Sequence, residues 1–179
     1  MVVSQNTDKL SGKEKKYEQL VSQISFLIKE ENDLIANLSN IVAALKYEMG
    51  FFWVGFYFVK PASGNFIKKN NNDFELVLGP FQGPVACTRI GFGKGVCGKC
   101  WAEKKTIIVD DVEKFPGHIA CSSESKSEIV LPVFNSDKKV IMVLDIDSDV
   151  LSSFNLMDKK YLSEIISILE TKPFISEKK

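Results

Sequence analysis

The stretch "SEIVLPVFNSDKKVIMVLDIDS", residues 127–148, decides the fold. It holds two runs rich in valine, isoleucine and leucine, 127–136 and 138–148, which meet at the polar letters "SDK". Runs of this composition on either side of a short polar turn predict two antiparallel strands that form a hairpin. The hairpin is therefore expected to belong to a mainly antiparallel sheet.

Three acidic residues lie within the hairpin. Because side chains alternate between the two faces of a strand, Asp145 and Asp147 share one face, and Leu144 and Ile146 share the other. Glu128 lies at the start of the partner strand, so the three acids can converge. Acids at a strand end are often only solvated, but beside strongly apolar residues they can also bind the ammonium group of a ligand.

The segments outside the hairpin complete an α+β domain. Apolar residues at helical spacing predict two helices within 13–49, broken at "KEEND". Beyond them we expect strands at 51–60, 74–81, 83–90 and 106–112, a short helix within 91–105 and an amphipathic helix at 157–170. Short connections favour a mainly antiparallel sheet of five or six strands, with the N- and C-terminal helices packed on one face. Residues 1–12 are expected to be loosely ordered, 13–171 to form the domain and 172–179 to form a tail.

Composition excludes several classes of function. The 179 residues include 23 Lys and Arg and 23 Asp and Glu, so the formal net charge is zero, which argues against a nucleic-acid-binding protein. The polar N-terminus shows no secretory signal, and no apolar run is long enough to cross a bilayer. We therefore expect a cytoplasmic protein of one domain with no membrane association.

Four cysteines in such a protein suggest metal, redox or catalytic chemistry. Cys97, Cys100, His118 and Cys121 have the spacing of a structural zinc site, but the chain has enough apolar residues to fold without a metal. Cys121 has polar neighbours, which favours a reactive thiol. Cys87 lies in an expected strand, where a small buried residue is the plain alternative.

Two further features are typical of a small-molecule site. Trp53 and Tyr57 share a face of the expected strand 51–60 and are either core residues or the walls of a pocket. The glycine-rich stretch "GFGKGVCG" (91–98) does not match a phosphate-binding loop. Its glycines can instead turn backbone N–H groups toward a small anion, such as a carboxylate, at the start of a helix.

Several blocks together carry a resemblance to a known family. "GPFQGPVAC" (79–87), "GFGKGVCG" (91–98), "FPGHIAC" (115–121), "SEIVLPV" (127–133) and "VLDIDS" (143–148) resemble the free methionine-(R)-sulfoxide reductases, which are built on a GAF domain. The resemblance runs from about residue 34 to residue 169. It implies a six-stranded antiparallel sheet with a pocket on one face, closed by loops.

The resemblance also implies roles for individual residues. Cys121 would be the nucleophile, and Cys87 or Cys97 would resolve it, with Cys87 slightly preferred. The other implied site residues are the acids around the substrate, with Glu128 as the proton donor, and an aromatic wall: Asp110, Asp111, Glu128, Asp145, Asp147, Trp53 and Tyr57. Thioredoxin would restore the thiols, and neither a metal nor an organic cofactor would take part.

Two positions depart from the family's pattern. Cys100 stands where a small residue without a thiol is usual, and Ser122 replaces an aspartate that often follows "GHIAC". Two alternatives stay open beside the enzyme: a GAF module that senses a small molecule without turning it over, and a zinc-binding interaction module. The helices within 13–49 are candidates for a homodimer interface.

Overall fold

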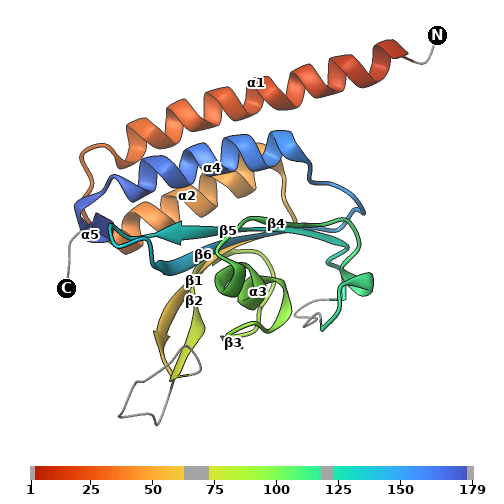
Figure 1. Cartoon of the computed structure of the whole chain (residues 1–179). Coiled ribbons are helices and arrows are strands. Elements are labelled where there is room, and N and C mark those ends of the chain that lie inside the picture. The colour runs from red at the N-terminus through yellow and green to blue at the C-terminus, as the bar shows by residue number, and fades with distance from the viewer. Residues whose placement is uncertain (1–2, 63–72, 118–122, 177–179) are drawn as a thin grey trace.

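The structure, a computed structural model, describes residues 3–62, 73–117 and 123–176 (Figure 1). Its centre is a six-stranded sheet with the order β3-β2-β1-β6-β5-β4, in which every neighbouring pair is antiparallel. The strands are β1 (Trp53–Pro61), β2 (Phe74–Gln82), β3 (Arg89–Gly91), β4 (Ile107–Val109), β5 (Ser127–Phe134) and β6 (Val140–Ser148). The predicted hairpin, β5 and β6, lies inside the sheet.

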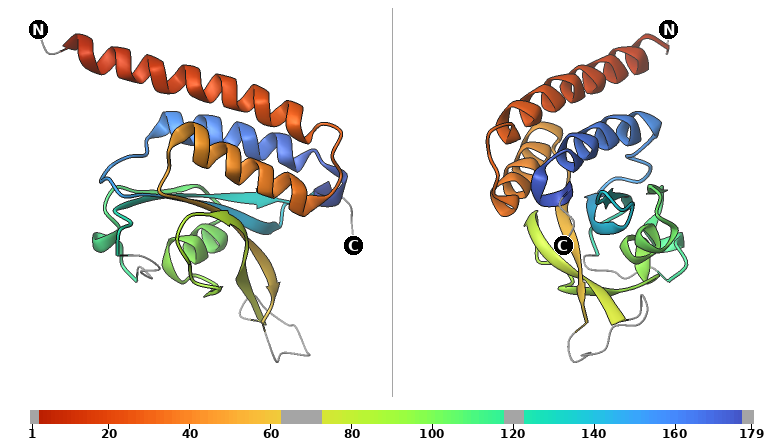
Figure 2. Two further views of the ribbon diagram at one scale, coloured as in Figure 1. Left: turned by 180° about the vertical axis from the view of Figure 1, so that it is seen from behind. Right: turned by 60° about the vertical axis from the view of Figure 1, so that its left-hand side comes forward.

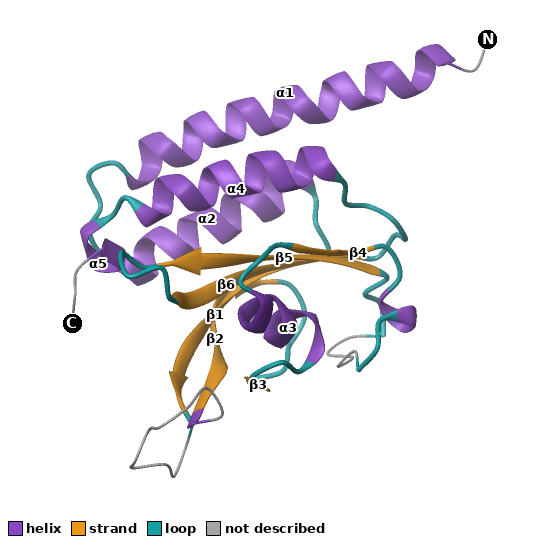
Figure 3. Ribbon diagram, in the orientation of Figure 1, coloured by secondary structure: helices purple, strands orange, loops and turns teal. Residues whose placement is uncertain are grey.

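The helices divide between the two faces of the sheet. They are α1 (Val3–Ile28), α2 (Leu34–Met49), α3 (Gly95–Glu103), the 3₁₀ turn η2 (Val112–Lys114), α4 (Leu156–Glu170) and α5 (Pro173–Ser176). Figures 1 and 2 show α1, α2 and α4 stacked on one face and α3 alone on the other. The structure thus confirms an α+β fold with the N- and C-terminal helices on one face, and Figure 3 shows the contrast between this helical layer and the sheet.

One set of apolar side chains of the sheet points toward the helical layer, and a second set packs with α3 on the opposite face. Leu144 and Ile146 of β6 are fully buried against the helical layer, together with Phe56 of β1 and Leu131 of β5. Tyr17 fastens α1 to α4, because its hydroxyl donates to Asp158 Oδ1 at 2.6 Å. This layer is the main hydrophobic core, and it supplies most of the apolar burial that stabilises the domain.

Local signals in the sequence define the ends of the helices. Asp33 accepts a hydrogen bond from the N–H of Ala36 at 2.8 Å and begins α2, and Gly50 ends it in the left-handed conformation (φ 70°). Asn155 and Asp158 form a capping box at the start of α4. The break that the sequence predicts at "KEEND" is therefore confirmed, and its last residue is the N-cap.

The structure corrects the expected strand at 83–90. Only Arg89–Gly91 pair with β2, as β3, and residues 83–88 form a loop. Pro84 has no N–H to donate to a ladder, and Gly83 has a φ of 145°, outside the range of strands. The misassigned segment carries Cys87, so this correction moves that cysteine from a strand to a loop.

Both ends of the chain also differ from expectation. Helix α1 begins at Val3, so residues 3–12 are helical where the sequence predicts a loose segment; no proline interrupts this run. At the other end Ile175 is buried, and Lys172 Nζ donates to the carbonyl oxygen of Ile28 at 2.6 Å. Residues 172–176 are therefore docked on the helical layer. Among the helices of the described residues, none combines the length and the apolar character needed to cross a membrane.

Candidate active site

Three acidic side chains meet on the face of the sheet opposite the helical layer. Glu128 of β5 lies opposite Asp147 of β6, and Val130 lies opposite Asp145, so Glu128 and Asp145 are diagonal neighbours. Glu128 and Asp145 are only 5% and 7% exposed, whereas Asp147 is half-buried. All three line the same pocket, as the alternation along the hairpin predicts.

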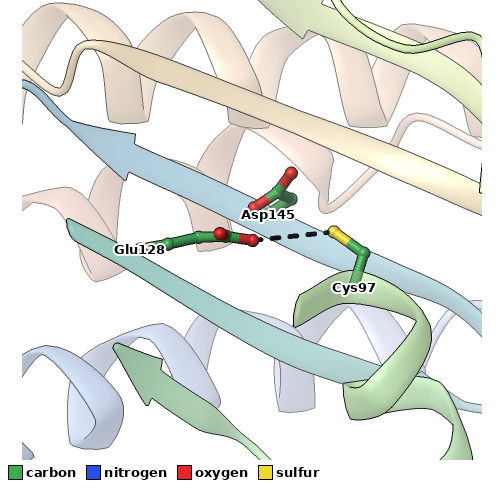
Figure 4. Close-up of side chains that lie close together, drawn as sticks. All are labelled: Cys97, Glu128 and Asp145. Atoms are coloured by element: carbon green, nitrogen blue, oxygen red, sulfur yellow. Dashed lines mark hydrogen bonds between the residues drawn. The ribbon is translucent and has the colours of Figure 1, made fainter. Parts of the chain in front are cut away.

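Helix α3 brings a thiol to this cluster. Cys97 lies in the first turn of α3, and its Sγ donates to Glu128 Oε1 at 3.9 Å (Figure 4). One ligand atom each from Cys97, Glu128 and Asp145 lies within 4.8 Å of the others. Figure 4 shows the three side chains converging from α3, β5 and β6.

Burial keeps protons on this cluster. Removal from water, reinforced by the charge of Asp145, raises the pKa of Glu128 and that of Asp147 well above the ordinary value. Burial likewise raises the pKa of Asp145 to about 6. The pKa of the Cys97 thiol is also raised, by burial first and then by the charges of Asp145 and Glu128. A cation in the pocket would reverse these effects and favour the ionised acids.

Asp145 offers an acceptor that no protein group uses. Its Oδ1 atom is buried and has no hydrogen-bond partner within the described residues. A buried carboxylate oxygen without a partner is costly in an isolated protein. The described residues that line the pocket include three carboxyl groups and no basic side chain, so the charge of the site favours a positively charged ligand.

Aromatic rings form another wall of the pocket. The rings of Trp53 and Tyr57 stack with centroids 6.0 Å apart, and Phe81 stacks on the outer side of Trp53 at 5.5 Å. Gly55 lies between Trp53 and Tyr57 and opposite Asp145, and a side chain there would overlap the indole. The tryptophan and the tyrosine predicted from the sequence therefore do share a face of the sheet and line the pocket.

The same two aromatic residues hold the loop that carries Cys87. Trp53 Nε1 donates to the carbonyl oxygen of Pro84 at 3.0 Å, and the Tyr57 hydroxyl donates to the carbonyl oxygen of Cys87 at 3.0 Å. Val85 and Ala86 of this loop line the pocket. The loop is thus fastened over the aromatic wall at two points.

The cysteines are in different states. Cys87 is half-buried and disulfide-bonded, whereas Cys97 and Cys100 are buried free thiols. Cys100 Sγ donates to the carbonyl oxygen of Val130 at 3.6 Å, so the two thiols of the C-x-x-C have different partners. His118, Cys121 and Ser122 lie outside the described residues.

Two predicted acids have other surroundings. Asp110 is exposed, and its carbonyl oxygen accepts from the N–H of Ser152. Asp111 caps η2 and forms an ion pair with Lys114 at 2.7 Å, which lowers the pKa of its carboxyl. Neither lines the pocket, so the structure does not place them with the other three acids. Both follow β4, at the edge of the sheet, and this position sets them apart.

Sequence reasoning missed Ser125. It is buried, lines the pocket and is hydrogen-bonded to Asp147, which lowers the pKa of that carboxyl against the larger effect of burial. Ser125 precedes β5 in a loop, where no periodicity marks its direction. Its place two residues before the first strand of the hairpin was the one available signal.

Residues at the start of α3 line the pocket. Gly95 and Val96 are among the lining residues. The N–H of Gly98 is the first in the helix to donate to a carbonyl oxygen one turn earlier, that of Lys94, at 2.9 Å. The preceding N–H groups of the first turn have no carbonyl one turn earlier to donate to. The predicted role of "GFGKGVCG" in turning N–H groups toward a small anion agrees with this arrangement.

Comparison with known proteins places the chain among related sequences and structures. A family model of the GAF domain matches residues 30–170. GAF domain-containing protein A from Dictyostelium discoideum is 56% identical over 89% of this chain and 93% of its own length, and free methionine-R-sulfoxide reductase from Saccharomyces cerevisiae is 39% identical over 88% and 86%. The structure of free methionine-R-sulfoxide reductase from Neisseria meningitidis in complex with its substrate is 48% identical, covers 89% of each chain and superimposes with a TM-score of 0.79.

Proposed function

This chain belongs to the GAF-domain family of free methionine-R-sulfoxide reductases, and we propose that it reduces free L-methionine (R)-sulfoxide to L-methionine through a cysteine and a disulfide that thioredoxin recycles. The observation that carries this proposal is the buried acidic pocket, in which Asp145 Oδ1 has no partner within the described residues. The substrate complex of the relative from Neisseria meningitidis supports it.

The pocket suits the ammonium group of a free amino acid. Glu128, Asp145 and Asp147 line it without a basic counterpart among the described lining residues. An ammonium group has three N–H donors, and charge-assisted hydrogen bonds to carboxylates are stronger than hydrogen bonds between neutral groups. Binding of this cation would also offset the cost of ionising buried carboxyl groups.

The other end of the substrate would bind at the start of α3. The free N–H groups of the first turn, near Gly95 and Val96, favour a carboxylate, as does the helix dipole. A residue inside a peptide lacks both terminal charges. Capture of the whole zwitterion therefore explains a preference for the free amino acid over the same residue in a protein.

The chemistry would follow the oxidation ladder of cysteine. The Cys121 thiolate attacks the sulfoxide sulfur and forms an S–S bond while the sulfoxide oxygen takes up a proton. The protonated oxygen then passes to the sulfur of Cys121 as the S–O and S–S bonds of the substrate sulfur break, so that methionine leaves and Cys121 becomes a sulfenic acid. A second thiol then attacks this sulfenic acid, which forms a disulfide and releases water. An external dithiol reduces the disulfide by exchange, and thioredoxin is our candidate for it.

Glu128 is the proton donor in this scheme. Burial raises the pKa of its carboxyl well above the ordinary value, which favours the protonated form, and its side chain lines the pocket. A protonated carboxyl beside the sulfoxide oxygen would stabilise the charge that develops as the S–O bond breaks. The free Cys97 thiol that donates to Glu128 helps to fix the orientation of this carboxyl.

Cys87 is a better candidate than Cys97 for the resolving cysteine, because Cys87 is disulfide-bonded and Cys97 is a free thiol. Cys87 is disulfide-bonded, whereas Cys97 and Cys100 are free, which leaves Cys121 as its proposed partner in a chain of four cysteines. Cys97 is also buried, and its raised pKa makes it a poor nucleophile. The half-buried loop position of Cys87 suits exchange with a protein dithiol.

A turnover assay tests the proposal. The purified full chain is mixed with thioredoxin, its reductase and the separated epimers of free methionine sulfoxide, and methionine is quantified. We expect consumption of the R epimer alone, no turnover by Cys121→Ser, and full turnover by Cys100→Ser as the matched control. Substrate binding without turnover by the wild type would favour the sensing module instead. A homodimer and a cytoplasmic location stay predictions.

A further inference from the structure

The pocket contains a thiol that the proposed reaction does not consume. Cys97 is 4% exposed, lies in the first turn of α3 and donates to Glu128 Oε1 at 3.9 Å. It is neither the proposed nucleophile nor the favoured resolving residue. A neutral thiol adds little to the binding of an ammonium group, since it carries no charge and is a weak acceptor. Besides orienting the Glu128 carboxyl, this thiol can serve a second purpose among the acids.

We propose that Cys97, Glu128 and Asp145 form a binding site for a thiophilic divalent cation, Zn²⁺, within the substrate pocket. The three side chains offer one sulfur and two oxygen ligands whose atoms all lie within 4.8 Å of one another. They come from α3, β5 and β6, so three separate elements position them (Figure 4). This site differs from the cysteine–histidine spacing in the sequence, because Cys100 bonds elsewhere.

The buried oxygen that the proposed function assigns to the substrate ammonium is also a position for a metal ligand. Asp145 Oδ1 is buried and unpartnered within the described residues, although Asp145 itself is only 7% exposed. An oxygen in that state lacks the donor or cation that would offset its removal from water. A metal bound beside Cys97 would satisfy it directly.

The separation of the Cys97 sulfur from the Glu128 carboxyl is close to that of a zinc site. Zn–S bonds of about 2.3 Å and Zn–O bonds of about 2.0–2.2 Å place sulfur and oxygen roughly 3.6 Å apart in a tetrahedral centre. The Cys97 Sγ to Glu128 Oε1 distance of 3.9 Å is near this value, so a small side-chain rotation would suffice. Three protein ligands leave a fourth position for water.

The chemistry of the ligand set selects the metal. Hard cations such as Mg²⁺ and Ca²⁺ prefer oxygen ligands, whereas a thiolate favours Zn²⁺. Binding would form metal–sulfur and metal–oxygen bonds as the Cys97 thiol and the protonated carboxyl of Glu128 lose their protons to solvent, with no change of oxidation state. The described lining residues carry no basic side chain that would repel the ion.

The site would make Zn²⁺ a competitive inhibitor of the reductase. This consequence rests on the proposed function, because it assumes that Glu128 and Asp145 also bind the substrate ammonium. The metal and the ammonium would need the same carboxylate oxygens and exclude each other. Binding of the metal itself does not depend on catalysis.

Cobalt spectroscopy tests the site without measuring activity. The full chain is used with Cys87 in its disulfide, so that Cys97 and Cys100 are the free thiols among the described residues, and Co²⁺ is added as a coloured substitute for Zn²⁺. We expect a thiolate-to-cobalt charge-transfer band that Zn²⁺ abolishes and Mg²⁺ does not. The band should vanish in Cys97→Ser and persist in Cys100→Ser, its matched control on the same helix.

A second variant and the addition of substrate complete the test. If Cys97→Ser does not fold, as judged by circular dichroism, Asp145→Asn replaces it, and we expect Zn²⁺ affinity to fall at least about tenfold, as is common when a metal site loses one partner. Absence of the band in the wild type, or an equal band in Cys97→Ser, overturns the site. Added methionine sulfoxide should weaken the band. A Cys97-dependent band that the substrate does not weaken refutes the competition but leaves the metal site.

Discussion

The face of the sheet beneath α2 and α4 is apolar, whereas the opposite face, beneath α3, carries three carboxyl groups and a thiol beside a second cluster of buried apolar side chains. Neighbouring residues of one strand supply both: Leu144 and Ile146 point to the helices, and Asp145 and Asp147 point to the pocket. One strand therefore serves both faces of the sheet, and different elements cover each face. Two helices, α2 and α4, cover one face and α1 lies on their outer side, while a short helix and a loop leave a pocket on the other face (Figure 2).

This contrast separates stability from function. The helix face contributes apolar burial, which is the main favourable term in folding. The pocket face buries ionisable groups without counter-charges among the described lining residues, which costs stability until a cation binds. We therefore expect substitutions on the first face to change stability and substitutions on the second to change activity.

The largest effect is expected from Leu144→Ala. The side chain is fully buried in the core with the helices, and its truncation should lower the free energy of unfolding by about 2–5 kcal/mol. Because Leu144 points away from the pocket, kcat/KM of the folded protein should stay within about twofold of the wild type. Urea unfolding and steady-state kinetics measure both. A large loss of kcat/KM in fully folded protein would contradict the separation of the faces.

Asp145→Asn should give the opposite result. It removes the charge that faces the substrate ammonium but keeps the shape, so kcat/KM should fall at least about 30-fold, equivalent to about 2 kcal/mol. The free energy of unfolding at neutral pH should not decrease, since the cost of burying a carboxylate, one of whose oxygens has no partner within the described residues, is removed. Asp149→Asn, at an exposed residue just after β6, is the control and should change neither quantity. Unchanged kcat/KM in Asp145→Asn would show that this carboxyl does not bind substrate.

The pocket face should also give stability a pH dependence. The unfolded chain releases the Asp145 proton near its ordinary pKa of 3.8, but the folded protein releases it at about 6. Between these values the folded state holds more protons, so the free energy of unfolding should fall as pH rises from about 4 to about 7, by up to about 2 kcal/mol. Urea titrations at several pH values measure the slope. Asp145→Asn should have a smaller slope, and equal slopes would refute this contribution.

The smallest effect concerns the cover of the pocket. A side chain on Gly98 would overlap the carbonyl oxygen of Gly91, so Gly98→Ala should displace α3 and lower the free energy of unfolding by about 1–2 kcal/mol, with a lower kcat/KM. Gly12→Ala is the matched control, because nothing lies within 4 Å of that position in α1. It should raise the free energy of unfolding by up to about 1 kcal/mol and leave kcat/KM unchanged. If Gly98→Ala raised the free energy of unfolding as Gly12→Ala does, the expected clash between a side chain at Gly98 and the backbone of Gly91 would be refuted.

The fold was predictable from local patterns to a large extent. Alternation identified the hairpin and the faces of its residues, and helical spacing identified α1, α2 and α4. The segment 83–90 was misassigned because its valine and threonine suggest a strand, while Pro84 and Gly83 prevent pairing. Asp110 and Asp111 were grouped with the site by resemblance, but the register of the sheet places them at its edge.

The sequence alone determined which side chains share a face, because alternation along a strand follows from backbone geometry and needs no distant contact. It thus placed Asp145 with Asp147, and Trp53 with Tyr57. Only the tertiary structure decided that Cys97 meets Glu128 and Asp145, and that the loop with Cys87 is fastened to Trp53 and Tyr57. Such meetings depend on how whole surfaces pack, and residues 30 or more positions apart carry no local signal of their separation in space.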